Sequence, residues 1–276
     1  MEDREHARVQ TFVFEGYDDQ KLHGFILRPL KQKERYQVII HYHGYSYHRG
    51  DIADFMPYLD AGYAVISFDI RNQGGKSGPF DGESMFQGLT HQDDYYYRKV
   101  YIDAVKVIDI VREVHDLENE RIALTGFSQG GAMAIVAAAL DRRPKAVMVE
   151  APAMSDFPCR IRLKTESIQN MVAYCAKHGI PEARYLETLT YYDVKHLIHS
   201  VRVPVLVGNG TKDPICPVEC FQPTFNMISA PKQLVIYQTD QHDEGGDAFM
   251  AYKIKWLNNI FSPTSPARFD PSIVRL

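Results

Sequence analysis

One short run of the sequence, Gly126-Phe127-Ser128-Gln129-Gly130, has the residue types and spacing of a reactive serine. A serine with glycine two positions to either side is typical of a sharp turn between a strand and a helix, where larger side chains would collide. Such a turn holds the hydroxyl above the end of the strand, and the first amides of the following helix face the reacting oxygen. We therefore predict that Ser128 is a nucleophile.

Asp213 and His242 are the partners that the sequence offers for this serine. A serine hydroxyl is a weak nucleophile and needs a base, which a carboxylate in turn orients. In proteins with this kind of turn, the acid and then the histidine follow the serine along the chain. Each residue lies in the loop that follows an apolar run, at 203–207 for the aspartate and at 233–237 for the histidine. Other carboxylates that would suit the role of the acid are Glu150, Asp240, Asp243 and Asp247.

Acyl transfer through a serine also needs two donors that stabilise the negative oxygen of the transition state. One donor is the backbone N–H of the residue after the nucleophile, and the other comes from the loop after an earlier strand. The apolar run at residues 37–42 leads into His43-Gly44-Tyr45. We therefore predict an oxyanion hole made by the backbone N–H groups of Tyr45 and Gln129.

The cysteines and histidines do not form a complete metal-binding pattern in the sequence. Cys216 and Cys220 would share one face of a helix, and His41 and His43 would share one face of a strand. Neither pair has further ligands at matching spacing, so we favour structural roles and expect no metal and no cofactor. We expect buried thiols in a reducing cytoplasm for all four cysteines, which are Cys159, Cys175, Cys216 and Cys220.

The elements that must position these residues follow from the apolar pattern. Strands are predicted at residues 9–14, 22–28, 37–42, 64–69, 121–125, 146–149, 203–207 and 233–237, and helices at 52–63, 97–111 and 130–140. A loop is expected at 70–90. This alternation predicts a mostly parallel, twisted sheet with helices on both faces. Because the carboxyl ends of parallel strands share one edge, Ser128, Asp213 and His242 should meet there.

A serine turn within such an alternating pattern is typical of the α/β-hydrolase fold. The 276 residues suit a single large domain, and we predict one domain over residues 1–276. Residues 151–200 break the alternation because they have a helical pattern without a clear strand. We interpret this segment as a helical insertion that caps the site.

Composition and charge exclude several other classes of protein. The formal net charge of −4 offers no broad basic surface for a nucleic acid. The longest apolar stretch, at residues 124–140, contains polar residues and glycines, which makes it a poor membrane span. The N-terminus lacks the apolar segment of a secretion signal. We expect a cytoplasmic protein whose partner is a small-molecule ester, without nucleic acid or membrane.

Several motifs together resemble one family, the acetyl xylan esterases and cephalosporin C deacetylases of carbohydrate esterase family seven. That family carries Arg-Gly-Gln-Gly, then Gly-x-Ser-Gln-Gly, then His-Glu. The corresponding runs here are Arg71-Asn72-Gln73-Gly74, the serine turn, and His242-Asp243. Further similar runs are Asp94-Tyr95-Tyr96-Tyr97-Arg98 and Asp213-Pro214-Ile215-Cys216-Pro217. Asn72 replaces a glycine of the family motif, and Asp243 replaces a glutamate.

The resemblance implies a serine esterase with the triad Ser128, Asp213 and His242 and with oxyanion donors Tyr45 and Gln129. It also implies deacetylation of small acetylated carbohydrates, a cytoplasmic location, no metal, and assembly into a homo-oligomer. Two alternatives stay open. One is a carboxylesterase, thioesterase or peptidase-like acyl hydrolase with another acyl preference, and the other is a non-catalytic binding protein on a hydrolase scaffold. Spacing does not decide acyl preference or a contribution from Glu150.

Overall fold

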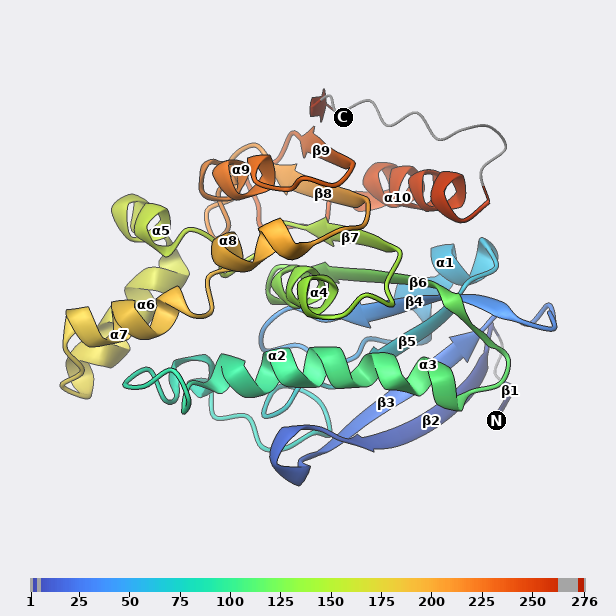
Figure 1. Ribbon diagram of the computed structural model, residues 1–276, viewed down its shortest axis with the longest axis horizontal. Helices are drawn as coiled ribbons and strands as arrows, with labels where there is room; N and C mark the ends of the chain where they lie inside the picture. The colour runs from blue at the N-terminus through green and yellow to red at the C-terminus, as the bar shows by residue number, and fades with distance from the viewer. Residues whose placement is uncertain (1, 4–5, 263–272, 276) are drawn as a thin grey trace.

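The protein is built on a ten-stranded sheet with the order β1-β2-β3-β5-β4-β6-β7-β8-β9-β10 (Figure 1). The computed structural model describes residues 2–3, 6–262 and 273–275. From β5 to β10 neighbouring strands are parallel, whereas β1, β2 and β3 are antiparallel to their neighbours. The strands are β1 Glu2–Asp3, β2 Arg8–Glu15, β3 Lys21–Arg28, β4 Tyr36–Tyr42, β5 Ala64–Phe68, β6 Leu117–Phe127, β7 Ala146–Glu150, β8 Val205–Gly210, β9 Lys232–Tyr237 and β10 Ile273–Arg275. The predicted, mostly parallel sheet is confirmed.

Helices cover both faces of this sheet, as the alternating sequence pattern predicts. In β4, Val38 and Ile40 belong to one buried cluster, which includes residues of α2, α4 and α9. Ile39 belongs to a second cluster, which includes residues of α1 and α10. The α-helices are α1 Met56–Asp60, α2 Tyr96–Lys106, α3 Ile110–Glu113, α4 Gln129–Leu140, α5 Phe157–Leu163, α6 Glu166–Lys177, α7 Glu182–Thr190, α8 Val194–Leu197, α9 Val218–Asn226 and α10 Gly246–Phe261.

Two predicted helices are less regular than the apolar pattern indicates. Five short 3₁₀ helices occur among the described residues: η1 Tyr17–Asp19, η2 Ile52–Phe55, η3 Ser84–Phe86, η4 Val107–Asp109 and η5 Ile198–Ser200. The helix predicted at 52–63 is therefore η2 followed by α1. It ends before Gly62, whose backbone is left-handed with a φ of +89°. The helix predicted at 97–111 is α2, η4 and α3 in succession. Tertiary packing overrides the regular helical period in both segments.

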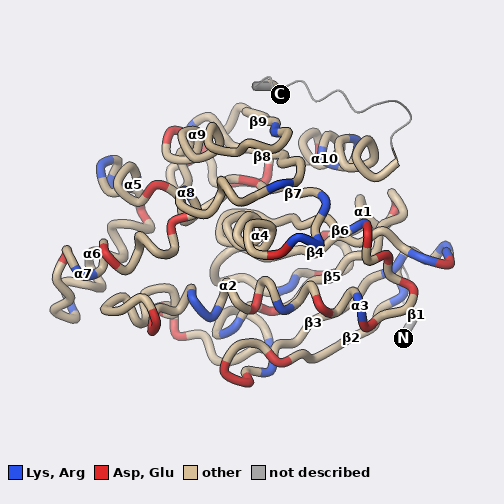
Figure 2. Tube along the Cα trace, in the orientation of Figure 1, with Lys and Arg blue, Asp and Glu red and all other residues tan. Residues whose placement is uncertain are grey.

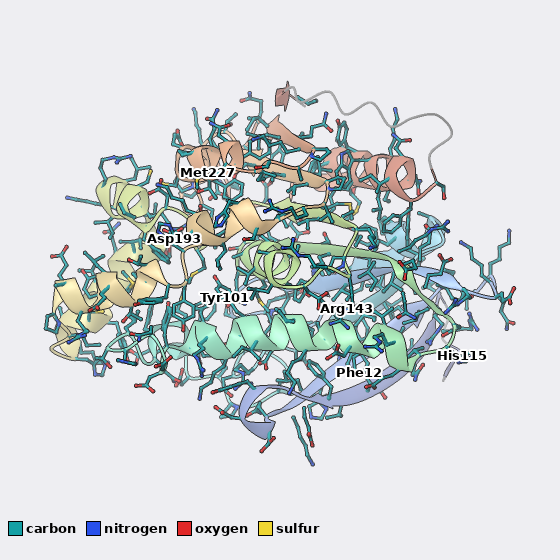
Figure 3. All side chains as sticks on the ribbon, in the orientation of Figure 1. Phe12, Tyr101, His115, Arg143, Asp193 and Met227 are labelled. Atoms are coloured by element: carbon teal, nitrogen blue, oxygen red, sulfur yellow. The ribbon has the colours of Figure 1, made fainter. Side chains whose placement is uncertain are left out.

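The segment 151–200 is helical, and α5, α6 and α7 lie together at the end of the molecule toward which the arrowheads of β6 and β7 point (Figure 1). Asp193, which is labelled in Figure 3, connects the start of α5 with α8 through hydrogen bonds. Its carboxylate accepts hydrogen bonds from the backbone N–H groups of Asp156 and Phe157 at the start of α5 and of Lys195 in α8. The residue before Asp193 is also held, because the Tyr101 hydroxyl on α2 donates a hydrogen bond of 3.1 Å to the carbonyl of Tyr192.

Charged residues are concentrated outside the central elements of the fold. Figure 2 shows acidic and basic positions on the outer helices and loops, whereas β4, β5, β8 and α4 carry none. Within the described part of the chain, no helix is both long enough and apolar enough to cross a bilayer.

Candidate active site

Ser128 occupies the turn between β6 and α4 in a backbone conformation that non-glycine residues rarely adopt, with φ 55° and ψ −116°. Glycine is required on both sides of it. A Cβ atom on Gly130 would lie 1.8 Å from the carbonyl oxygen of Tyr42, and one on Gly126 would lie 2.5 Å from Gly130. The Ser128 N–H donates a hydrogen bond of 2.9 Å to the carbonyl of Glu150, the last residue of β7. The turn is therefore held against two neighbouring strands.

Asp213 and His242 come together at the edge of the sheet where the sequence places them. Asp213 follows β8, His242 follows β9, and the imidazole Nδ1 lies 2.6 Å from Asp213 Oδ2. The other carboxylate oxygen, Oδ1, accepts hydrogen bonds from the N–H groups of Ile215 at 2.8 Å and Cys216 at 2.7 Å. A carboxylate held on both oxygens fixes the orientation of the imidazole and favours the tautomer with the proton on Nδ1.

The Asp213 carboxyl titrates below its ordinary range. Burial acts to raise its pKa, but the hydrogen bonds from His242 and from the Cys216 amide outweigh burial, and the net pKa is lowered. Asp213 is 3% exposed, so these few donors take the place of bulk water around the charge.

Ser128 and His242 line the same cavity, which has a volume of about 890 Å³. The imidazole packs against the ring of Phe127, the residue before the serine, with the ring centroids 4.4 Å apart. Among the described residues no hydrogen bond joins Ser128 to His242, and the serine side chain contacts the thiol of Cys216 instead. In proteins without substrate, catalytic hydrogen bonds are often long or not yet formed.

The competing carboxylates have other partners. Glu150 is 2% exposed and forms an ion pair with Lys253, which is buried as well. Burial raises the pKa of the Glu150 carboxyl, and the Lys253 ammonium opposes that rise. The Asp243 carboxylate accepts hydrogen bonds from Thr239 Oγ1 and the Gly245 N–H. The other two, Asp240 and Asp247, are exposed.

The two predicted oxyanion donors lie on either side of the serine turn. Tyr45 is in the loop after β4, and Gln129 is the first residue of α4. Within the described residues, neither backbone N–H has a hydrogen-bond partner in the protein. The Tyr45 side chain reaches away to the loop after β5, where its hydroxyl bonds the Gly82 carbonyl at 3.3 Å and the Met85 N–H at 3.2 Å.

Sequence reasoning did not assign a role to the side chain of Gln73, which connects these two loops. Gln73 is 2% exposed, and its Oε1 accepts a hydrogen bond of 3.0 Å from the Ser46 N–H, next to Tyr45. Its amide also bonds the side chain of Gln129, which in turn accepts a hydrogen bond of 2.9 Å from the Tyr97 hydroxyl. The Arg71-Asn72-Gln73-Gly74 motif marks this residue in the sequence. Its role could not be predicted from the motif, because its partners lie in segments far away along the chain.

A buried ion pair anchors the start of this motif. The Arg71 guanidinium donates two hydrogen bonds to Asp103 on α2, at 2.5 and 3.0 Å. Tyr96 donates a hydrogen bond to the Arg71 carbonyl and accepts one from Gln73. Asn72 has a φ of +52°, a left-handed conformation that glycine adopts freely and asparagine tolerates. Asparagine therefore suits the backbone at this position, where the family motif has glycine.

The histidines and cysteines considered for a metal site have separate structural partners. His43 Nε2 accepts a hydrogen bond of 2.9 Å from the Ile70 N–H, and burial lowers the pKa of this histidine to about 4. His41 Nδ1 bonds Ser67 Oγ at 3.0 Å. Cys216 precedes α9, so it does not share a helical face with Cys220 as the spacing suggested. Across the described ranges, no three His, Cys, Asp or Glu side chains cluster in a way that would hold a metal.

Comparison with known proteins assigns this arrangement to one family. Residues 2–260 match the family described as acetyl xylan esterase (AXE1). Two solved acetyl xylan esterases have the same fold along nearly the whole chain. The enzyme from Paenibacillus sp. R4 has a TM-score of 0.86 and 25% identity, covering 95% of this chain and 87% of the other. Acetyl xylan esterase 1 from Thermoanaerobacterium sp. JW/SL YS485 has a TM-score of 0.85 and 26% identity, covering 94% and 86%.

Curated relatives are similar over shorter regions. Acetyl esterase Axe7A from Xylanibacter ruminicola is 30% identical over 171 residues, which is 59% of this chain and 37% of that protein. Putative hydrolase YtaP from Bacillus subtilis is 25% identical over 182 residues, 61% of this chain and 60% of the relative. The matched region thus spans about a third of the first protein and three fifths of the second.

Proposed function

The chain belongs to the acetyl xylan esterase family, and from this we propose that it is a serine esterase that removes acetyl groups from small acetylated carbohydrates. In this proposal Ser128 is the nucleophile, His242 the general base and Asp213 the residue that orients the base. The single observation that carries the proposal is the hydrogen bond of 2.6 Å between His242 Nδ1 and Asp213 Oδ2, in a cavity that Ser128 also lines.

The first half of the reaction forms an acyl-enzyme. In this proposal the Ser128 side chain turns away from Cys216 and its hydroxyl bonds to Nε2 of His242, which has no hydrogen-bond partner among the described residues. Nε2 takes the hydroxyl proton while Oγ bonds to the ester carbonyl carbon. Asp213 stabilises the resulting imidazolium. The tetrahedral intermediate then expels the alcohol, which takes the proton from His242, and the acetyl group stays on Ser128.

The negative oxygen of the intermediate needs donors that are in place before the reaction begins. The N–H groups of Tyr45 and Gln129 suit this role because they lack other partners among the described residues. One such donor is typically worth about 3 kcal/mol of transition-state stabilisation. In the second half of the reaction, water attacks the acyl-enzyme with His242 again as base, which releases acetate and restores Ser128.

A second candidate is an acyl hydrolase with a preference for larger acyl groups. The cavity volume of about 890 Å³ supports this alternative, because an acetyl group fills only a small part of it. The two candidates differ in how the rate depends on acyl length, and in whether acetate is released from acetylated sugars.

The experiment is a series of 4-nitrophenyl esters from acetate to octanoate, together with acetate release from peracetylated xylose. We expect kcat/KM to be greatest for acetate and to fall steadily as the chain lengthens. A maximum at octanoate would reject the deacetylase in favour of the second candidate. Absence of turnover on every ester would reject both, and would favour a binding protein without catalytic activity.

Two further proposals concern the setting of the enzyme. We propose a cytoplasmic location, which is supported by four buried cysteines that are all free thiols. We also propose a homo-oligomer, which rests on the family resemblance and is testable by light scattering of the purified chain.

A further inference from the structure

Arg160 on α5 is a buried cation in the wall of the cavity that holds Ser128. The residue is only 4% exposed to solvent. The guanidinium donates hydrogen bonds to Ser167 Oγ at 2.8 Å, to the Ile215 carbonyl at 3.0 Å and to Cys216 Sγ at 3.6 Å. All three partners are uncharged acceptors.

Arg160 forms no ion pair with a carboxylate of the described residues. Within the described part of the chain, no Asp or Glu oxygen lies within 4.0 Å of the Arg160 guanidinium. Two carboxylates in the segments that contact Arg160 have partners of their own. Asp156 pairs with Lys195 at 2.8 Å, and Asp213 pairs with His242. Glu166 also lines the cavity, but it is exposed at the start of α6.

A guanidinium removed from water without a counter-charge is costly, and proteins usually pair such a group with an anion. Its planar donors match the two oxygens of a carboxylate. Ion pairs elsewhere in this protein follow that rule, since the buried Arg28 and Arg71 each bind an aspartate through two nitrogens. Arg160 is a buried guanidinium like these two, but it lines the cavity and has only uncharged partners among the described residues.

We propose that Arg160 recognises a carboxylate on the alcohol part of the substrate. This inference rests on the proposed function. If the acyl group is acetyl, it carries no carboxylate, so the carboxylate must belong to the alcohol part of the ester. Cys216 contacts both the Arg160 guanidinium and the Ser128 side chain. A substrate with its ester at Ser128 would therefore place its carboxylate on the Arg160 side of Cys216. The substrate class is an acetylated hydroxy acid, such as an acetylated sugar acid.

The test compares substrates that differ only in charge. The pairs are 3-acetoxybenzoate with 3-acetoxybenzamide, and 4-acetoxybenzoate with 4-acetoxybenzamide. We expect the wild-type protein to prefer one of the benzoates over its amide by about ten-fold or more in kcat/KM, the scale of a hydrogen bond to a charged group. Arg160→Gln should abolish that preference, and Arg160→Lys, which keeps the charge, should retain part of it.

Arg162 provides the matched control. It lies two positions further along α5, is exposed, and donates a hydrogen bond to Cys159 Sγ at 3.2 Å. Arg162→Gln makes the same change of charge outside the cavity, so it should leave the benzoate preference unchanged. If both variants reduced the preference equally, the effect would be one of general charge, and the proposal would be wrong.

A purely structural role for Arg160 has a different signature. If Arg160 only positioned the loop that carries Asp213, Arg160→Gln would slow the benzoate and the amide equally and leave their ratio unchanged. That result, or a wild-type ratio near one for both pairs, would overturn the proposal. Turnover of the neutral amides tests the proposed esterase function separately.

A binding measurement needs no turnover. Isothermal titration of 3-hydroxybenzoate and 4-hydroxybenzoate into the Ser128→Ala variant should give affinities about ten-fold weaker once Arg160→Gln is added. Thermal denaturation of each variant verifies that it is folded. If adding Arg160→Gln left the affinity for each of the two hydroxybenzoates unchanged, the proposal would be overturned.

Discussion

Gln73 and Gln129 form a reciprocal pair of hydrogen bonds, in which each side-chain amide donates to the oxygen of the other, at 3.0 and 3.2 Å. Gln129 supplies one proposed oxyanion donor. Gln73 binds the Ser46 N–H and so holds the loop that supplies the other, Tyr45. The pair thus fixes the distance between two donors that come from different elements. Donors that are already in place before the reaction stabilise developing charge without a cost of reorganisation.

Replacing Gln73 should reduce the rate more than it affects substrate binding. Gln73→Ala leaves the Ser46 N–H without its partner, removes the two hydrogen bonds between Gln73 and Gln129 and loosens the Tyr45 loop. We therefore expect kcat to fall by roughly ten- to a hundred-fold. The loss of buried hydrogen bonds should cost about 1–3 kcal/mol of stability. Steady-state kinetics and urea unfolding measure both effects. Gln87→Ala, at an exposed position, is the control, and an equal loss there would contradict this role.

The strained backbone of Ser128 predicts a conflict between stability and activity. Ser128→Ala should abolish ester turnover, by roughly a million-fold, while the fold persists. Ser128→Gly should be equally inactive but more stable than Ser128→Ala by about 1 kcal/mol, because glycine adopts the positive φ without strain. The control is Ala139→Gly, within α4, which should be destabilising. Equal stability of the alanine and glycine variants at position 128 would show that the turn carries no strain.

The acid of the proposed triad can be tested among the carboxylates. Asp213→Asn removes the charge that orients His242, and we expect kcat to fall roughly ten-thousand-fold. Asp240→Asn changes an exposed carboxylate in the loop that leads to His242, and it should have little effect. Initial rates on 4-nitrophenyl acetate measure both variants. A larger loss in Asp240→Asn than in Asp213→Asn would reassign the acid.

The buried ion pair between Arg28 and Asp116 predicts a dependence of stability on pH. Burial acts to raise the pKa of Asp116, but the hydrogen bonds and charge of Arg28 outweigh it, so the net pKa is lowered. A carboxyl with a lowered pKa stabilises the folded state above its ordinary pKa of about 4, and this contribution is lost as the pH falls through the folded-state pKa.

We therefore expect the difference in unfolding free energy between wild type and Asp116→Asn to be constant from about pH 7 to 5 and to shrink below about pH 4. The measurement is urea unfolding at several pH values. Asp60→Asn, which alters an exposed carboxylate, is the control and should show little difference at any pH. A difference that grew on acidification would show that the pKa is shifted in the opposite direction.

Much of the fold could be predicted because its causes are local. The run at 37–42 predicts a strand buried on both faces, and Val38 and Ile39 indeed point into different clusters. The helix predicted at 52–63 was too regular, because the apolar period does not reveal where 3₁₀ geometry interrupts a helix. The strand β10 was not predicted, because it has only three residues and an apolar alternation cannot be recognised over so short a run.

By itself, the sequence determined the family, the parallel sheet and the place of Ser128, since apolar alternation and the glycines around a sharp turn act over a few residues. The sequence favoured Asp213 but left four other carboxylates open, and only the tertiary structure shows that Asp213 binds His242. Only the tertiary structure likewise shows that Gln73 and Gln129 link the two predicted oxyanion loops, and that buried Arg160 has no carboxylate within 4.0 Å among the described residues. Those contacts join segments as far as 56 positions apart. A hydrogen bond or an ion pair depends on distances of a few ångströms, which only the packing of the whole chain sets.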